Sequence, residues 1–411
     1  MKIQRMTLMA LLLFFASACT LLTPAPGAIP TAGPATSLPP SESPATAEMP
    51  APTESPSTAT LAPVATESPT ATAEAAAFGP QNFPANIAPL TGKTVGDPSL
   101  LERRPLAVKI QLFPRGGRPP WGVSSADIVY DYYQNFGLTR LHAIFLSHNA
   151  ETVGPIRSAR LLDQSLVSMY QSIFAFGSAE QRTYSRLFGA EYANRLVVEG
   201  NTNCPPLCRE DPNGANYLVT NTDQLSAYAS SKGVDNVRQN LDGMYFNSST
   251  PAGGQPVKQI FVRFSISAYT FWDFNPDAGR YLRFQDTQEA NDLQTENYAP
   301  LPDRLTGEQL AADNVVVIYA PIQYAFGTKP GPSEVVDILL SGSGPAYAFR
   351  DGQVFQVNWN RPNKNSVLFL TLPDGSPYAL KQGTTWFEVI GQSSKLETSN
   401  PGVFRFLHSI P

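Results

Sequence analysis

The sequence predicts an α+β protein with two folded parts, an N-terminal α/β-type domain with a mixed sheet and packed helices and a β-rich C-terminal domain. Three observations support this fold class. Up to about residue 233, strand-like runs rich in β-branched and aromatic residues are followed by segments with helical apolar spacing. Beyond residue 256 the chain reads mainly as strands, with two Asp-Gly hairpin signals. The first 85 residues have a composition that does not form a core.

The chain starts with the features of an exported protein. A positively charged start leads into an apolar stretch, residues 6–15, which has signal-peptide length and is too short to span a bilayer. The stretch ends in Ala-Ser-Ala before Cys19, so residues 1–18 are predicted to be a signal peptide. Cys19 is predicted to carry lipid chains that anchor the protein in the membrane. The alanines at 16 and 18 also suit ordinary signal peptidase, so a secreted form stays open.

Residues 19–85 are predicted to form a disordered stalk. After Cys19 they are dominated by Ala, Pro, Thr and Ser, with five Glu and no Lys or Arg. Such a segment buries too little apolar surface to offset the entropy of ordering, and its prolines favour extended backbone. A chain of roughly 65 residues reaches about 45 Å as a flexible coil and about 200 Å as a polyproline helix. The folded part is therefore expected outside the cytoplasm and away from the membrane surface.

The remaining residues are nearly balanced in charge, with 27 basic and 29 acidic side chains and no basic stripe, which argues against a nucleic-acid partner.

Cys204 and Cys208 are spaced Cys-Pro-Pro-Leu-Cys, for which a small-loop disulfide is expected outside the cytoplasm. A redox-active motif normally has two intervening residues, and zinc would need two further ligands. We therefore predict no metal and no cofactor, and we assign surface or half-buried roles to the three histidines.

The N-terminal domain is predicted to span residues 86–248. Its strands are expected at 107–112, 127–133 and 141–147. From Pro155 onward the apolar positions fall at helical spacing, and proline suits the first turn, so a helix is predicted to begin there. A second helix is expected to start after Asn221 or Thr222 and to end at Gly233.

The C-terminal domain is predicted to span residues 256–411, after a polar boundary segment at 247–255 that contains Gly and Pro. Its strands are expected at 259–265, 314–320, 346–350, 353–359, 367–372 and 385–390. The Asp-Gly pairs at 351–352 and 374–375 predict hairpin turns between the flanking strands. This half of the chain is therefore expected to be built from antiparallel strands.

Several motifs resemble one known family. The run Gly-Pro-x-Arg-Ser-x-Arg at 154–160 is the most specific, and Ser-Ala-Asp-Ile-Val-Tyr-Asp at 125–131 and Gly-Thr-Thr-Trp at 383–386 agree with it. Together they resemble the YerB-like lipoprotein family (domain of unknown function 3048). The resemblance implies a bacterial envelope lipoprotein with paired N- and C-terminal domains, and it implies no activity.

The sequence departs from that family's pattern at three positions. Gln111 stands where Asp is usual, Asn135 where Glu is usual, and Ala215 where His is common. If the family uses the Glu as a catalytic acid, this chain has lost it.

Arginine side chains form the main candidate site. Arg157 and Arg160 fall in the first turns of the helix predicted at Pro155, where positive charge opposes the helix macrodipole and free backbone N–H groups favour anions. A negative partner is therefore expected. It is either an anionic ligand, phosphate or carboxylate, or an internal carboxylate from Asp127, Asp131 or Glu151. The candidate ligand-binding residues are Arg140, Arg157, Ser158, Arg160, Arg209, Asp127 and Asp131.

The leading hypothesis is a non-enzymatic binding or scaffold protein of the cell envelope, with an arginine-lined site for an anionic or polar ligand and no assigned catalytic residue. One alternative is a hydrolase or transferase that acts on an envelope polymer, with Asp127 or Asp131 as acid or base. These two aspartates lie about 13 Å apart along one strand, so they cannot share a proton. Another alternative is a structural protein that docks a partner through an exposed sheet edge or an aromatic patch. A pocket joining the arginines to a carboxylate or to Ser178 would favour the enzyme.

Overall fold

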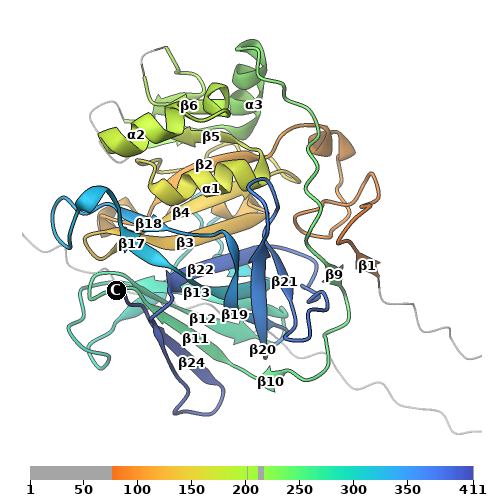
Figure 1. The fold of residues 1–411 in the computed structure, drawn as a ribbon, viewed down its shortest axis with the longest axis vertical. Coiled ribbons are helices and arrows are strands. Elements are labelled where there is room, and N and C mark those ends of the chain that lie inside the picture. The colour runs from red at the N-terminus through yellow and green to blue at the C-terminus, as the bar shows by residue number, and fades with distance from the viewer. Residues whose placement is uncertain (1–75, 201, 212–216, 411) are drawn as a thin grey trace, which may run out of the picture. The chain divides into compact units, whose positions relative to one another are not determined.

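An eleven-stranded sheet runs through both halves of the sequence (Figure 1). The computed structural model describes residues 76–410 apart from 201 and 212–216, so the predicted signal peptide, Cys19 and most of the stalk lie outside the described residues. The strand order is β10-β20-β19-β16-β22-β3-β4-β2-β5-β6, with β21 paired to β20. The N-terminal half contributes β2 (Leu106–Gln111), β3 (Ile128–Asn135), β4 (Leu138–Phe145), β5 (Ile173–Phe176) and β6 (Leu196–Val198). The C-terminal half contributes β10 (Gln255–Pro256), β16 (Asn314–Ala320), β19 (Gly342–Arg350), β20 (Gln353–Arg361), β21 (Phe369–Thr371) and β22 (Thr385–Gly391).

The two halves of the chain meet at β3 and β22, which pair in parallel over five residues of each strand. Both strands are almost entirely buried, as is typical of parallel strands that are covered on two faces. Residues 86–248 and 256–411 therefore share one sheet within one compact unit. Their division into two domains stays a prediction.

A seven-stranded sheet from the C-terminal half packs against this junction. Its order is β14-β13-β12-β11-β24-β23, with β15 paired to β13. The strands are β11 (Gln259–Arg263), β12 (Tyr269–Asn275), β13 (Arg280–Asp286), β14 (Tyr298–Pro300), β15 (Ala311–Ala312), β23 (Lys395–Glu397) and β24 (Val403–Leu407). The buried rings of Trp272 on β12 and Trp386 on β22 meet edge to face at 5.0 Å, which joins the two sheets in one core.

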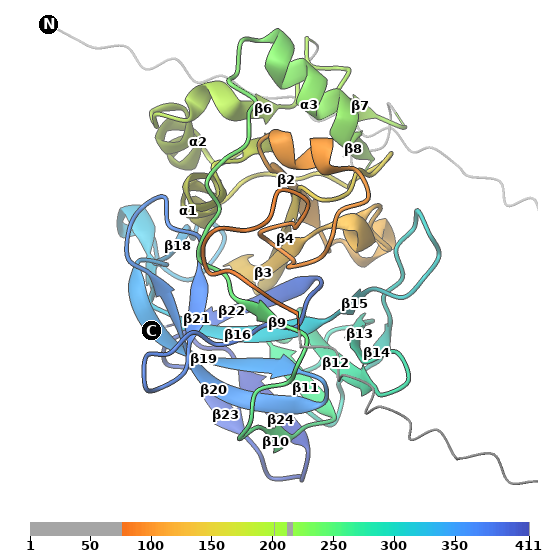
Figure 2. The same ribbon diagram turned by 90° about the vertical axis from the view of Figure 1, so that its right-hand side faces the viewer.

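Three α-helices lie in the described part of the chain: α1 (Leu161–Tyr170), α2 (Gln181–Phe188) and α3 (Thr222–Ser231). Figures 1 and 2 place them at one end of the molecule, around β2, β5 and β6, whereas the other end consists of strands. The protein is thus mostly sheet, with few helices. None of the helices in residues 76–410 is long and apolar enough to cross a membrane.

Three short two-stranded pairs complete the fold. They are β1 (Ala77–Phe78) with β9 (Phe246–Asn247), β7 (Leu207–Arg209) with β8 (Leu218–Thr220), and β17 (Ile322–Tyr324) with β18 (Val336–Ile338). The pairing of β1 with β9 shows that residues 76–85, at the end of the predicted stalk, belong to the folded unit.

The predicted strands overlap β2, β3, β4, β11, β16, β19, β20, β21 and β22, with differences of a few residues at their ends. Asp351 and Gly352 both have positive φ and close the β19–β20 hairpin, as the Asp-Gly signal predicts. Asn221 caps α3, and its side chain accepts the Gln224 N–H at 3.0 Å.

The prediction of a helix that begins at Pro155 was wrong. The first helix, α1, begins at Leu161. Residues 153–159 are instead extended, because their backbone groups bond to four other segments of the chain.

Candidate functional site

The segment 153–160 lies between the end of β2 and the loop after β5. The Arg157 N–H donates to the Lys109 carbonyl at 3.0 Å, and the Ile156 N–H donates to the Leu218 carbonyl at 2.7 Å. Further along, the Ala159 N–H donates to the Ser178 carbonyl at 2.7 Å. These bonds fix the backbone from which Arg157 and Arg160 project. Only Arg160, as the residue that precedes α1, lies at a helix N-terminus.

Three arginine side chains meet beside this segment. Arg140 Nη1 and Arg160 Nη1 both donate to the Ser158 carbonyl, at 2.6 Å and 3.4 Å, which limits the separation of the two nitrogens to 6.0 Å. Arg157 Nε donates to Gln111 Oε1, and Gln111 is the cross-strand partner of Arg140. We call Arg140, Arg157, Ser158 and Arg160 the arginine site.

The charge of Asp163 acts on both Arg140 and Arg160, but Asp163 forms no direct ion pair with either side chain in the described part of the chain. Within residues 76–410, leaving out the undescribed gaps, neither Arg140 nor Arg160 forms an ion pair with a carboxylate. Burial lowers the pKa of Arg140 well below its usual range, and the charges of Arg160 and Arg157 lower it further. Burial also lowers the pKa of Arg160. The site therefore places guanidinium groups close together in a partly desolvated position.

Neutral donors lie next to these arginines. The hydroxyl groups of Ser158 and Ser178 are 3.0 Å apart, and Ser178 is exposed. Gln111 is only 2% exposed, and its Nε2 has no hydrogen-bond partner among the described residues. A buried amide donor without an acceptor is unusual in a folded protein.

A buried polar network lies beneath the arginine site. Asp163 Oδ1 accepts from Lys109 Nζ at 3.3 Å, from the Tyr132 hydroxyl and from His142 Nδ1 at 2.8 Å. Its Oδ2 accepts the backbone N–H of Arg160 at 2.6 Å, which connects the network to the site. All four network side chains are fully buried.

Burial and the shared carboxylate shift the pKa values of this network. Burial lowers the pKa of Lys109 to about 7, although the charge of Asp163 acts in the opposite direction. Burial raises the pKa of Asp163, but Lys109 and the hydrogen bond from His142 outweigh it and hold the pKa of that carboxyl well below its usual range. The prediction of a surface or half-buried role was wrong for His142, which is inaccessible.

Sequence reasoning missed Lys109, Tyr132 and Asp163 as members of the network. A signal was present, because Lys109 and Gln111 on β2 and Arg140 and His142 on β4 alternate with apolar residues. Such period-two polar positions place their side chains on one face of the sheet. Recognising them as one site requires the register that pairs Lys109 with His142, which one sequence does not reveal.

Asp127 and Asp131, which were predicted to bind the ligand with the arginines, lie apart from the arginine site. Asp127 is 1% exposed and accepts the backbone N–H groups of Leu146 and Ser147 at 2.5 Å and 3.1 Å, so it fixes the chain after β4. Asp131 lies on the opposite face of β3 from Tyr132 and binds Arg283 Nη2 at 2.5 Å, between the two sheets. Neither aspartate is therefore placed to bind the same ligand as the arginines, or to act as an acid or base beside them.

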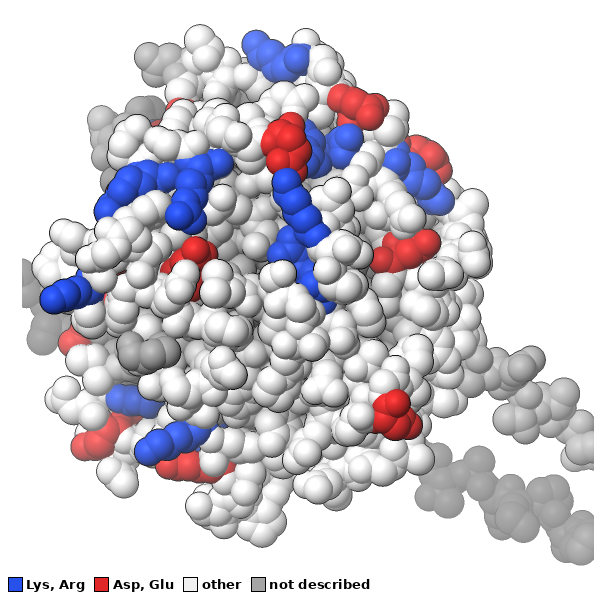
Figure 3. Space-filling model, viewed as in Figure 1, with Lys and Arg blue, Asp and Glu red and all other residues white. Residues whose placement is uncertain are grey.

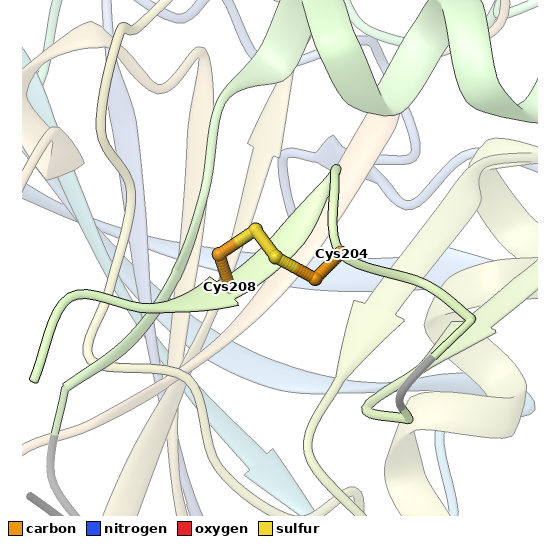
Figure 4. Close-up of a disulfide and its surroundings, with 2 residues drawn as sticks. All are labelled: Cys204 and Cys208. Atoms are coloured by element: carbon orange, nitrogen blue, oxygen red, sulfur yellow. A yellow bond between two sulfur atoms is a disulfide. The ribbon is translucent and has the colours of Figure 1, made fainter. Parts of the chain in front are cut away.

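Arg209 borders the arginine site and has its own carboxylate partner. Its Nη2 lies 2.6 Å from Glu199 Oε1, and its charge contributes to lowering the pKa of Arg157. The preceding residues form the disulfide Cys204–Cys208, with the two Cα atoms 4.9 Å apart (Figure 4). This bond closes the loop that leads into Arg209 on β7.

The face drawn in Figure 3 carries charges of both signs. On the face drawn in Figure 3, basic and acidic side chains form small groups, some of them in contact, over a mostly uncharged surface. A typical exposed pair joins Lys364 Nζ to Glu191 Oε1 at 2.6 Å, with both side chains more than half exposed. The arginine site differs from such pairs because its basic groups are partly buried.

Comparisons with known proteins agree with this fold. Residues 90–235 match "Protein of unknown function (DUF3048) N-terminal domain", and residues 260–387 match the DUF3048 C-terminal domain. "Putative lipoprotein YerB" of Bacillus subtilis (strain 168) is 27% identical over 308 residues, which cover 74% of this chain and 86% of that protein. The crystal structure of YerB from Bacillus subtilis has a TM-score of 0.60 and 24% sequence identity, and the match covers 74% of this chain and 96% of that one. The chain therefore belongs to the DUF3048 family, with both of its domains present.

Proposed function

We propose that this protein is a lipid-anchored protein of the cell envelope that binds an anionic ligand at the arginine site, without catalysing a reaction. The observation that carries the proposal is the pair Arg140 and Arg160, whose guanidinium groups share one carbonyl oxygen and have no carboxylate partner in the described part of the chain. Buried charges in proteins are normally paired, and leaving one unpaired is costly. An anion bound there would supply the missing negative charge.

Two other arginines buried in the described fold differ from this pair. Arg283 binds the carboxylates of Asp131 and Glu388, and Arg350 binds that of Asp351 at 2.8 Å. Arg361 is also buried, but it donates to backbone carbonyls, so the contrast rests on Arg283 and Arg350. Gln111 and Asn135, which accept hydrogen bonds from Arg157 and Arg160, are neutral amides and add no negative charge.

Binding of small anions to the mature protein would test this proposal. Isothermal titration with inorganic phosphate and with succinate at constant ionic strength should detect at least one of them. Arg140→Gln and Arg160→Gln should each weaken that binding at least tenfold, because a charge-assisted hydrogen bond contributes about 1.5–3 kcal/mol. Lys364→Gln removes the same charge from an exposed pair and is the matched control. If neither anion binds, or if the control weakens binding as much, the proposal is wrong.

The lipid anchor rests on separate support. Small residues precede Cys19, and the related Bacillus subtilis protein carries the name of a lipoprotein. Cells that produce the full chain should incorporate a palmitate analogue into it, and globomycin should make the unprocessed precursor accumulate. Cys19→Ser should abolish the labelling. Absence of labelling in the unaltered protein would contradict the anchor and would leave the anion site untouched.

A further inference from the structure

The hydrogen-bond donors around the arginine site indicate which class of anionic group it binds. Building on the proposed function, we infer that the arginine site takes a phosphoryl group, as found in a phosphate ester or a phosphodiester, in preference to a carboxylate. The inference rests on how many donors surround the site, on the segments that supply them, and on two neutral donors that a single carboxylate would leave unused.

The arginines offer more N–H groups than one carboxylate accepts. Each guanidinium has five, and a carboxylate is usually satisfied by one guanidinium that binds it through two parallel bonds. The protein uses Nη1 of Arg140 for the Ser158 carbonyl, and it uses both Nη atoms of Arg160 for carbonyl oxygens and for Asn135 Oδ1. The remaining N–H groups of Arg140 stay available to a ligand. A phosphoryl group, with two or three free oxygens, can use donors from both arginines.

The donors come from separate parts of the chain. Arg140 belongs to β4, Gln111 ends β2, Ser158 and Arg160 belong to the extended segment 153–160, and Ser178 follows β5. Donors on four segments approach a bound group from different directions. The oxygens of a phosphoryl group point toward the corners of a tetrahedron, whereas the two oxygens of a carboxylate lie in one plane.

Gln111 supplies the most specific evidence. Its side-chain oxygen is occupied by Arg157, and its Nε2 is buried without a partner among the described residues. Gln111 is the cross-strand partner of Arg140, so the two side chains project from the same face of the sheet. An oxygen of the ligand would satisfy a donor that the protein leaves unsatisfied.

The paired serines supply a further donor. When one hydroxyl of Ser158 and Ser178 donates to the other, the second hydroxyl keeps a proton that it can donate elsewhere. Ser178 is exposed, so this proton can reach a bound group from the solvent side. Neutral hydroxyl and amide donors suit the ester and free oxygens of a phosphoryl group, and the arginines balance its charge.

Titrations matched for charge would test the inference on the mature protein. Dimethyl phosphate and acetate are both monoanions, and glycerol 3-phosphate and succinate are compared as dianions, all at the same pH and ionic strength. Each phosphoryl compound should bind at least tenfold more tightly than the carboxylate of the same charge. The comparison of dimethyl phosphate with glycerol 3-phosphate shows whether the site prefers a diester or a monoester.

Two variants connect this preference to the neutral donors. Ser178→Ala should weaken phosphoryl binding by about threefold to tenfold and should leave carboxylate binding nearly unchanged, because only the larger group reaches that donor. Ser230→Ala, an exposed serine on α3, is the matched control. If carboxylates bind as tightly as phosphoryl compounds, the phosphoryl assignment is overturned while the proposed function stands. If no anion binds, both are overturned.

Discussion

Replacement of Asp163 by Asn should destabilise the protein, because the buried Lys109 would lose its counter-charge. In the folded state Asp163 accepts hydrogen bonds from Lys109, Tyr132 and His142 on one oxygen, and the N–H of Arg160 on the other. The asparagine side chain has nearly the same shape but carries no charge, and its NH₂ group would face donors. We therefore expect the loss to come from electrostatics and hydrogen bonding, with little change in packing.

Two estimates bear on this loss. Removing one partner of a buried ion pair costs about 3–5 kcal/mol of unfolding free energy. Alternatively, without Asp163 the buried Lys109 would be neutral at pH 7. Deprotonating a side chain whose ordinary pKa is 10.5 costs about 5 kcal/mol at that pH. Most of this cost is already present in the unaltered protein at pH 7, where burial lowers the pKa of Lys109 to about 7. The additional cost of deprotonating Lys109 in Asp163→Asn is therefore small at pH 7 and grows below it.

The pH dependence gives the sharper test. Because the pKa of Lys109 is about 7 when folded and 10.5 when unfolded, the unfolded chain binds more protons between these values. Lys109 should therefore make stability rise with pH between 7 and 10.5, and it should contribute no slope below 7. In Asp163→Asn the folded pKa falls further, so the rising region extends to lower pH. The difference between the two proteins should grow by about 1.4 kcal/mol for each pH unit from 7 down to 5.

Urea unfolding followed by circular dichroism at pH 5, 6, 7 and 8 would measure this difference. Glu191→Gln breaks the exposed pair with Lys364 and should shift stability by about 1 kcal/mol or less at every pH. The double variant Lys109→Met, Asp163→Asn removes both charges and should recover most of the stability. If Asp163→Asn lowers stability by the same amount at all four pH values, Lys109 is not the titrating group and the reasoning fails.

Three further predictions concern other parts of the molecule. Gln111→Glu should place a carboxylate against Arg157 and weaken phosphate binding about tenfold in a titration. Burial raises the pKa of Glu388 to about 7, so stability should fall by about 3 kcal/mol as pH rises from 4.5 to 7, and Glu388→Gln should abolish that slope in urea unfolding. Reduction of the disulfide in the 204–208 loop should cost about 2 kcal/mol, measured by the shift in thermal unfolding, because the loop is short.

The strands could be predicted from sequence where their residues follow a simple pattern. The buried run of β16 and the Asp-Gly turn between β19 and β20 are local signals, and the structure has both. The strands β12 and β13 were missed because polar and charged residues such as Asp273 and Arg283 interrupt their apolar pattern. Arg283 is compatible with a core only because Asp131 and Glu388, distant in sequence, neutralise it. Local sequence patterns do not reveal ion pairs between residues that are far apart in the chain.

The arginines of the site could be identified from sequence, but the structure around them could not. Pro155 and the apolar spacing after it favoured a helix, and the spacing does describe α1 from Leu161 onward. The preceding residues form bonds with β2 and β8 that no local propensity reveals, and these tertiary bonds determine their conformation. Asp131 was predicted as a site residue because a carboxylate was expected opposite the arginines. Successive side chains of a strand point to opposite faces, so Asp131 and Tyr132 serve different sides of β3.

The buried network explains why the arginine site keeps its positive charge although Asp163 lies nearby. Asp163 is one negative charge, and it acts on Lys109 at 3.3 Å as well as on Arg140 and Arg160, so it cannot balance all three. An anion bound above the network would favour the protonated form of Lys109. Its binding should therefore raise the pKa of Lys109, and by linkage its affinity should fall as pH rises through 7. Phosphate titrations between pH 6 and 8 should show this decrease in affinity after correction for the ionisation of phosphate itself. An affinity that does not change with pH would show that anion binding is not coupled to the protonation of Lys109.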